Sequence, residues 1–250
     1  MKSRQRKSEI LTMLAHDDLE VIMAALEDFS PTDLINPLFS ALYRSEEQLR
    51  WHAVSVLGQI VPRLARQEME AARIVMRRFL WSLNDESGGI GWGAPEAMAE
   101  IMAYEPRLLE EYIHMLISYM REDGPLDFQD GNYLELPALQ RGLLWGVGRL
   151  AEKQPGKLLK RQVVVDLIPY LKSEDHVVRG LAARCLGLLA GTDVSDSGDF
   201  TDSAADSIAP LLADETMIRL YVEGEFVDTT VAALAHEAMA RLATLSDAVV

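Results

Sequence analysis

Cysteine, long apolar runs and basic charge are all scarce in this chain of 250 residues. The single cysteine, Cys185, excludes an internal disulfide and any zinc site built on cysteines. No stretch approaches the ~18 consecutive apolar residues that suggest a membrane-spanning helix. The basic N-terminus is followed by only a short apolar stretch, residues 10–15, which makes a poor signal peptide. We therefore expect no membrane partner and a cytoplasmic location.

The shortage of basic residues bears on the partner. The chain has 24 Lys and Arg against 39 Asp and Glu, a formal net charge of −15. Four of those basic residues lie in the first seven positions, so the remainder carries 20 against 39. Affinity for nucleic acid rests mainly on Lys and Arg contacts to phosphates. The composition therefore disfavours nucleic acid and favours a basic partner, whose approach an acidic body would steer.

Motifs of catalysis and of metal or cofactor binding are missing as well. The five histidines are scattered, and none has another histidine three to five residues away. The glycines at 89, 91 and 93 do not form the dinucleotide fingerprint, and no predicted strand precedes them. No Gly-x-Ser-x-Gly elbow occurs. We therefore predict no catalytic residue, no metal and no cofactor.

A repeated pattern is the strongest feature that the sequence does contain. Residues 175–189 match residues 46–60 almost position for position: an acid, then Arg four later, Ala three after that, Leu four further on and Gly directly behind. Aligning the chain on that last position gives five units with spacings of 41, 49, 39 and 53 residues. Paired-helix repeats have periods of roughly 40–47 residues. The five anchor positions are Gly58, Ala99, Gly148, Gly187 and Ala240.

This pattern resembles HEAT repeats, particularly the short bacterial kind also found in phycobilin-lyase-like proteins. The resemblance is strong at 46–60 and 175–189 and looser in the other three units. It implies that Arg50 and Arg179 brace the stack through acids in the turns. Arg141 is displaced by one position, which makes the third unit irregular.

The repeats predict an all-α fold, a right-handed α-solenoid of about five HEAT-like helix pairs. Each anchored helix follows another amphipathic stretch; these stretches span residues 31–43, 67–83, 106–121, 158–171 and 202–212. Insertions at 85–93, 123–134 and 191–202 break the regularity. Alternation on both sides of Glu223-Gly224 indicates a small β-hairpin. We predict one domain, 1–250, with an N-terminal helical cap (1–30), helix-pair repeats (31–213), the hairpin (214–229) and a last helix (230–250).

Glycine at the same position of three units indicates a close approach of neighbouring helices, because glycine inside a helix costs about 1 kcal/mol relative to alanine. The positions one and five residues past the arginine lie one turn apart on a single helix face. Three of the four tryptophans fall on this ridge. Read unit by unit, the ridge is Trp51 and Ser55, Trp92 and Glu96, Arg141 and Trp145, Gly180 and Arg184, Ala233 and Glu237.

The ridge supplies the predicted binding surface, because aromatic and arginine side chains are the usual anchors of interfaces. The alternative is that these tryptophans fill gaps between successive helices. Trp81, on a preceding helix, is expected in the core. The predicted partner-binding residues are Trp51, His52, Trp92, Glu96, Arg141, Trp145 and Arg184.

These features favour a non-catalytic scaffold that binds a peptide or a partner protein in a concave, tryptophan-lined groove. A second copy of the chain is one option for that partner. The alternative is a HEAT-type enzyme or chromophore-handling, lyase-like protein, in which tryptophans stack a planar ligand and arginines clamp its carboxylates. A third hypothesis, similarity to the HEAT-like alkylpurine DNA glycosylases, conflicts with the acidic charge.

Overall fold

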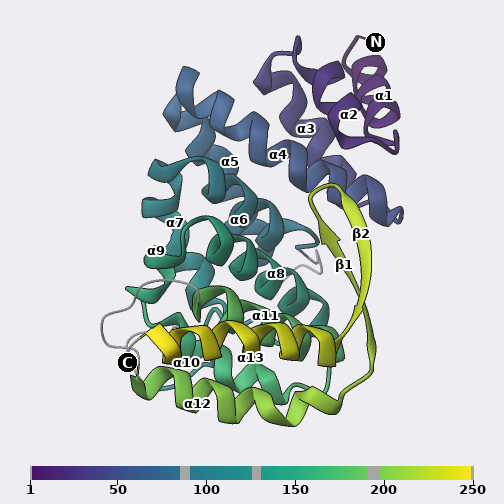
Figure 1. The fold of residues 1–250 in the computed structure, drawn as a ribbon. Coiled ribbons are helices and arrows are strands. Elements are labelled where there is room, and N and C mark those ends of the chain that lie inside the picture. The colour runs from purple at the N-terminus through teal and green to yellow at the C-terminus, as the bar shows by residue number, and fades with distance from the viewer. Residues whose placement is uncertain (1, 85–90, 126–130, 191–197, 249–250) are drawn as a thin grey trace. The chain divides into compact units, whose positions relative to one another are not determined.

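The computed structural model describes residues 2–84, 91–125, 131–190 and 198–248 (Figure 1). The chain divides into two compact units. Unit 1 comprises Met1–Leu116 and the hairpin turn Glu223–Glu225, and unit 2 comprises Ile117–Val222 and Phe226–Val250. The three predicted insertions lie partly outside the described residues. The prediction of one domain stays a prediction.

Unit 1 is built from helices that pack in pairs. Its elements are α1 (Lys2–Leu14), α2 (Leu19–Leu26), α3 (Pro31–Leu42), α4 (Glu47–Gln67), α5 (Met69–Leu83), α6 (Ala94–Tyr104) and the start of α7 (Pro106–Ser118). The long helix α4 packs against α3, α5 and α6. The Phe39 ring of α3 stacks on the Phe79 ring of α5, with centroids 4.4 Å apart. Leu57, at the repeat's leucine position on α4, is fully buried.

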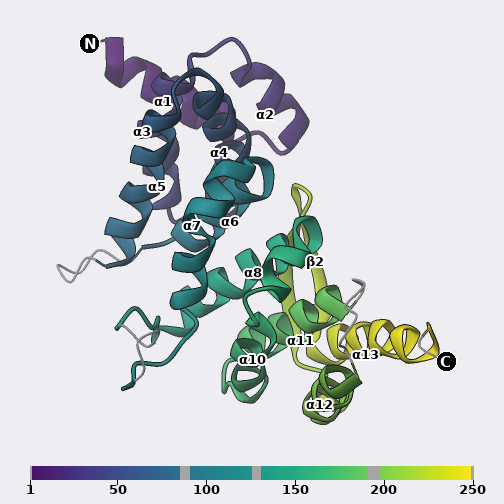
Figure 2. The same ribbon diagram turned by 90° about the vertical axis from the view of Figure 1, so that its left-hand side faces the viewer.

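Unit 2 continues the helical pattern and ends in the hairpin and a last helix. Its elements are α8 (Pro137–Lys153), α9 (Pro155–Leu159), α10 (Val163–Leu167), the 3-10 helix η1 (Ile168–Lys172), α11 (His176–Ala190), α12 (Gly198–Ile208), the 3-10 helix η2 (Ala209–Ala213), β1 (Met217–Val222), β2 (Glu225–Thr230) and α13 (Val231–Ala248). Helix α11 packs against both α8 and α13, and Figures 1 and 2 show α11 between these two helices.

The predicted helix-pair architecture is confirmed. All five anchor positions lie in helices, namely α4, α6, α8, α11 and α13. Two predicted first helices differ from single α-helices: 202–212 changes from α12 to the 3-10 helix η2 at Ala209, and 158–171 is broken into α9, α10 and η1. Gln162 adopts a left-handed φ of 57°, which interrupts the α-helix between α9 and α10. Pro169 has no backbone N–H to donate to the residue four positions earlier, which suits the 3-10 turn η1.

The hairpin is confirmed at its predicted turn, and β2 extends to Thr230. Glu223 and Gly224 both have positive φ, 49° and 96°. Two consecutive positive φ values define the type I′ turn, whose twist matches that of the strands it joins. Ile218 and Leu220 on β1 are buried, so the strand turns one side toward the core of unit 2.

Close helix approach explains glycine at the repeat position in unit 2. A Cβ added to Gly187 of α11 would lie 2.6 Å from the Ala238 Cα and 2.8 Å from the Ala238 Cβ of α13. At Gly148 of α8, the same repeat position, an added Cβ would lie 3.4 Å from Cys185 Sγ, an ordinary contact. Glycine is therefore required at 187, whereas the space at 148 also admits an alanine.

This difference predicts opposite effects of one substitution at equivalent positions. Gly187→Ala should lower the free energy of unfolding by about 1–3 kcal/mol, because α11 and α13 must move apart. Gly148→Ala should leave it unchanged or raise it by up to ~1 kcal/mol through helix propensity. Urea unfolding followed by circular dichroism measures both. Equal effects of the two substitutions would contradict the close approach at Gly187.

Candidate functional site

In unit 1, helices α4 and α6 carry the first two pairs of ridge residues. Trp51 lies on α4 and Trp92 precedes α6, and both indoles are partly exposed. The two helices pack together so closely that Glu100 of α6 covers Gly58 of α4. Glu96 lies on α6 one turn before Glu100. We refer to Trp51, Trp92 and Glu96 as the Trp51 face.

Glu96 is the most unusual group of this face. Its side chain keeps some exposed surface, but Oε2 is inaccessible to solvent and has no hydrogen-bond partner among the described residues. Burial raises the pKa of the Glu96 carboxyl to about 7, an effect that the charge of Arg50 opposes. A carboxyl with this pKa exchanges its proton near neutrality and still has an oxygen that can accept a hydrogen bond.

His52, the neighbour of Trp51, has a different position from the one predicted for a binding residue. It has no exposed surface. Its Nδ1 donates to the Leu14 carbonyl oxygen of α1, 2.9 Å away. His52 therefore joins α4 to α1 inside unit 1, and a partner at the surface cannot touch it.

Arg141, on α8, belongs to a set of links between repeats. Its guanidinium binds both carboxylate oxygens of Asp175, the shortest contact being 2.6 Å. Asp175 Oδ1 also accepts from the backbone N–H groups of Val177 and Val178, so this aspartate caps α11. One repeat later, Arg179 binds Asp214 at 2.7 Å. These links bear out the bracing role expected of Arg179, with Arg141 in the same role.

The remaining ridge residues of unit 2 also have partners within the unit. The Trp145 indole N–H donates to the Tyr221 carbonyl oxygen of β1, 2.9 Å away, and the ring stays partly exposed. Arg184 of α11 binds Glu152 of α8 at 2.6 Å, and Glu152 also accepts from Arg149. These side chains hold neighbouring elements together, as the gap-filling alternative expects of Trp145.

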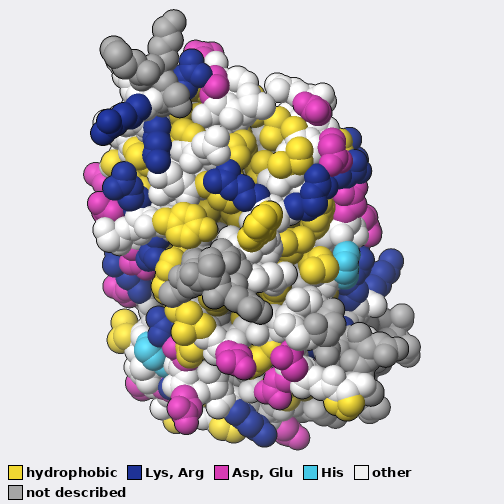
Figure 3. Space-filling view, turned by 180° about the vertical axis from the view of Figure 1, so that it is seen from behind, with side chains coloured by type: hydrophobic (Ala, Val, Ile, Leu, Met, Phe, Trp, Pro, Cys, Tyr) yellow, Lys and Arg dark blue, Asp and Glu magenta, His cyan; other side chains and the backbone are white. Residues whose placement is uncertain are grey.

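Trp81 is not in the core, contrary to the prediction. Trp81 is 76% exposed, the largest value among the large hydrophobic residues that the structure describes. It shares the outer face of α5 with Ile74, Arg77 and Arg78, all exposed at positions three and four residues apart. Phe79, two residues earlier on α5, is buried on the opposite face of the helix, which leaves Trp81 on the outer face. Figure 3 shows hydrophobic side chains bordered by Lys and Arg.

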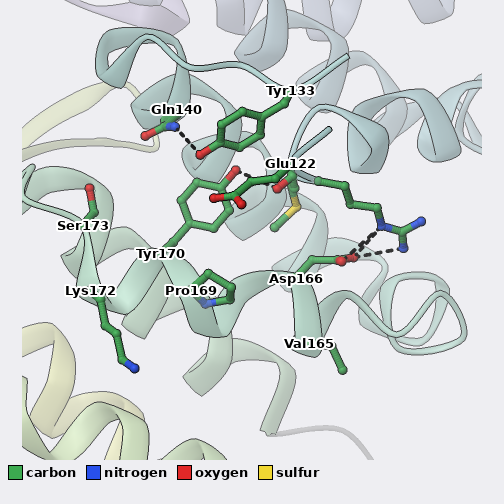
Figure 4. Close-up of a pocket in the computed structure, with 11 residues that line it drawn as sticks. Glu122, Tyr133, Gln140, Val165, Asp166, Pro169, Tyr170, Lys172 and Ser173 are labelled. Carbon is green, nitrogen blue, oxygen red and sulfur yellow. Dashed lines mark hydrogen bonds and ion pairs between the residues drawn. The ribbon is translucent and has the colours of Figure 1, made fainter. Parts of the chain in front are cut away.

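A pocket of about 330 Å³ lies within unit 2, between the segment after α7 and the helices α10 and η1 (Figure 4). This volume is at the small end of the range for ligand sites. Its residues combine two phenols, an amide, charged side chains and apolar walls. They are Met120, Arg121, Glu122, Tyr133, Gln140, Val165, Asp166, Pro169, Tyr170, Lys172 and Ser173.

Hydrogen bonds hold the two phenols of the pocket in place. The Tyr170 hydroxyl donates to the Met120 carbonyl oxygen at 2.9 Å. The Tyr133 hydroxyl accepts from Gln140 Nε2 at 3.1 Å, and that amide also donates to the Leu134 carbonyl oxygen. Burial raises the pKa of both hydroxyls, and the nearby Glu122 carboxylate raises them further. The phenols therefore stay protonated at neutral pH.

The charges of the pocket are only partly matched. Arg121 binds both oxygens of Asp166, with Nη2 3.0 Å from Oδ2 and Nε 3.1 Å from Oδ1. Glu122 is exposed, and no described cation pairs with it.

The sequence did not predict this pocket, because Tyr133 falls in the insertion 123–134, which breaks the repeats, and Tyr170 falls in the stretch 158–171, which is expected to be a regular helix. The sequence feature that could have indicated the pocket is a tyrosine next to a place where the repeat is irregular.

Two further observations limit the chemistry of the described part of the chain. Residues 2–84, 91–125, 131–190 and 198–248 hold no group of three or more His, Cys, Asp or Glu placed to bind one metal ion. Burial raises the pKa of the Cys185 thiol to about 12, so it is a poor nucleophile. Over the same ranges, no helix combines the length and apolar character needed to cross a membrane.

The pKa of Glu96 predicts a pH-dependent effect of Glu96→Gln. Above about pH 4.5 the unfolded state ionises while folded Glu96 keeps its proton, so the wild type loses stability up to about pH 7. Glutamine does not ionise. The variant should therefore match the wild type near pH 4.5 and exceed it at pH 8 by up to about 3 kcal/mol. Urea unfolding at both pH values measures this, with Glu9→Gln, exposed on α1, as the control. A pH-independent difference would contradict the burial of Glu96.

Comparison with known proteins gives likeness in sequence and in fold. No protein-family model matches the chain. An uncharacterized protein of Archaeoglobus fulgidus is 27% identical over 216 residues, covering 85% of this chain and 97% of its own length. Among solved structures, an engineered protein superimposes with a TM-score of 0.55 at 14% identity, covering 95% of this chain and 98% of its own. A second engineered protein gives 0.50 at 15% identity, covering 95% and 96%. Together with the helix pairs, these matches show a fold of stacked helix pairs, an α-solenoid.

Proposed function

We propose that this protein is a non-catalytic scaffold that binds a peptide or a partner protein at the Trp51 face of unit 1. The observation that carries the proposal is an unsatisfied carboxyl oxygen of Glu96 on α6, a helix that packs against α4, while Trp51 of α4 and Trp92 just before α6 keep partly exposed indoles. The proposed binding surface therefore keeps only those predicted binding residues that belong to unit 1. His52 is left out because it is buried.

The inaccessible Glu96 oxygen supports a polar contact with a partner. A buried acceptor without a hydrogen bond costs about 1–3 kcal/mol, and most such groups in folded proteins are satisfied. The Glu96 side chain keeps some exposed surface, so a rotation that brings Oε2 to that surface would let an N–H group or a cation of a bound peptide supply the missing donor. Such a contact also favours the ionised form of Glu96, which the unbound protein disfavours.

The two indoles support the same interpretation. Tryptophan provides a large apolar surface with one polar edge, and it is among the commonest anchors of protein interfaces. Trp51 lies on α4 and Trp92 directly precedes α6, and these two helices pack together, so both residues are attached to a preformed helix pair. The net charge of −15 favours a basic partner. A peptide with an apolar residue next to Lys or Arg fits these features.

The lyase-like alternative depends on arginines that clamp the carboxylates of a planar ligand. Arg141 and Arg184, the arginines assigned to that role, bind Asp175 and Glu152 within unit 2. Clamping a ligand would require both ion pairs to break. This cost favours the scaffold, and a flat tryptophan-fluorescence titration with tetrapyrroles is the result that the scaffold predicts.

The proposal predicts which tryptophan matters for binding. Basic peptides selected from a display library against the full chain should bind Trp51→Ala and Trp92→Ala about 10–100-fold more weakly, since anchor residues contribute roughly 1.4–3 kcal/mol. Trp81→Ala is the matched control, because Trp81 is 76% exposed on α5 and outside the Trp51 face. Isothermal titration calorimetry gives the dissociation constants.

Other results of this experiment have definite meanings. Failure to select any peptide, or equal losses for Trp81→Ala and Trp51→Ala, would refute the assignment of the Trp51 face. Circular dichroism of each variant separates lost binding from lost folding. Light scattering of the chain alone identifies the case in which the partner is a second copy.

A further inference from the structure

We propose that the pocket of unit 2 binds an organic cation, the ammonium or guanidinium group of a lysine or arginine side chain or of a free alkylamine. This inference does not rest on the Trp51 face, because none of the pocket residues belongs to it. It rests on a carboxylate, two fixed phenol rings and the size of the cavity.

Glu122 provides the charge that such a cation needs. Figure 4 shows its carboxylate directed toward the two phenols. Within the described part of the chain, no Lys, Arg or His forms an ion pair with it. Because Glu122 is exposed, a ligand can reach it from solvent. The carboxylate therefore lies at the cavity with its charge unmatched.

Tyr133 and Tyr170 provide aromatic surfaces beside that charge. A cation over a tyrosine ring gains about 0.5–2 kcal/mol, more when it is partly desolvated. Both rings are held by hydrogen bonds, to Gln140 and to the Met120 carbonyl oxygen. A site whose rings are already in place loses little conformational entropy on binding.

The size and walls of the pocket fit one alkyl-linked cation. A volume of about 330 Å³ accommodates a single long side chain or a small amine. Met120, Val165 and Pro169 provide apolar surface for the methylene stem. This combination of apolar walls with one charged end matches the amphipathic character of lysine and arginine.

An anionic ligand fits this pocket less well. Arg121 has both Asp166 oxygens as partners, so its charge is matched within the protein. Lys172 lines the pocket, but in Figure 4 its side chain extends away from the phenols. An anion near the rings would meet Glu122 and the negative faces of both phenols. The unmatched charge at the rings is therefore negative.

Ligand-observed NMR titration of the full chain tests the proposal with probes of defined charge. Nα-acetyl-lysine methylamide, a lysine side chain in a peptide context, and n-butylammonium, a free amine, should bind in about the millimolar range, as suits one small group. The Nε-acetylated lysine probe has the same stem without charge and should bind at least about tenfold more weakly. Tighter binding of the lysine probe than of n-butylammonium identifies a peptide-borne ligand, and equal binding identifies a free amine.

Variants locate the site. Glu122→Gln should weaken both cationic probes at least about tenfold, since it removes the charge and keeps the shape. Glu174→Gln, an exposed carboxylate outside the lining residues, should leave both dissociation constants unchanged. Tyr133→Phe, which keeps the ring and removes the hydroxyl, should cost less than Glu122→Gln. Circular dichroism confirms that each variant is folded.

The outcomes separate this proposal from that of the Trp51 face. Absence of binding by both cationic probes, or binding that Glu122→Gln leaves unchanged, would overturn the pocket proposal. Equal binding of the neutral Nε-acetylated probe would do the same. None of these results would affect peptide binding that depends on Trp51 and Trp92.

Discussion

The close approach of α11 and α13 is the constraint on which the C-terminal part of unit 2 depends. Where α11 meets α13, the backbone of Ala238 occupies the space that a side chain at Gly187 would need. Helices that pack this closely leave no room in their seam for large side chains. Tryptophans and arginines of the repeat are therefore placed at the borders of the seam. The ridge predicted from the sequence follows from the exclusion of large side chains from the seam, and this holds whether or not the ridge binds a partner.

The charged side chains at those borders form ion pairs between neighbouring repeats. Arg141 and Arg179 each bind an aspartate that is about one repeat further along the chain, and Asp175 also caps α11. Arg141 binds both oxygens of Asp175, and such a bidentate pair fixes the orientation of both groups, so this link helps to set the register between two repeats. The same geometry leaves the two arginines with matched charges. Residues that fall outside this scheme, such as Glu96, are the ones that can serve another purpose.

Periodicity made the helices predictable, and it failed where the outcome depends on a partner distant in the sequence. All five anchored helices and the turn at Glu223-Gly224 could be read from local patterns. The α-helix is interrupted at Gln162 by a backbone angle that glutamine rarely adopts, so the sequence did not predict this interruption. The pairing of Arg141 with Asp175 spans 34 residues, and the periodic pattern does not specify which acid an arginine meets. The pocket was missed because its phenols come from irregular segments.

The two proposed sites share one physical preference. In an acidic chain most carboxylates are exposed and hydrated, and a hydrated ion pair contributes little to affinity. A carboxylate beside an aromatic ring differs, because an arriving cation gains the attraction of the ring together with that of the charge. Glu96 is four residues after Trp92, at the start of α6, and Glu122 lines a pocket together with two phenols. Under the two proposals, the acidic surface attracts a basic partner and the aromatic side chains determine where on each unit that partner is retained.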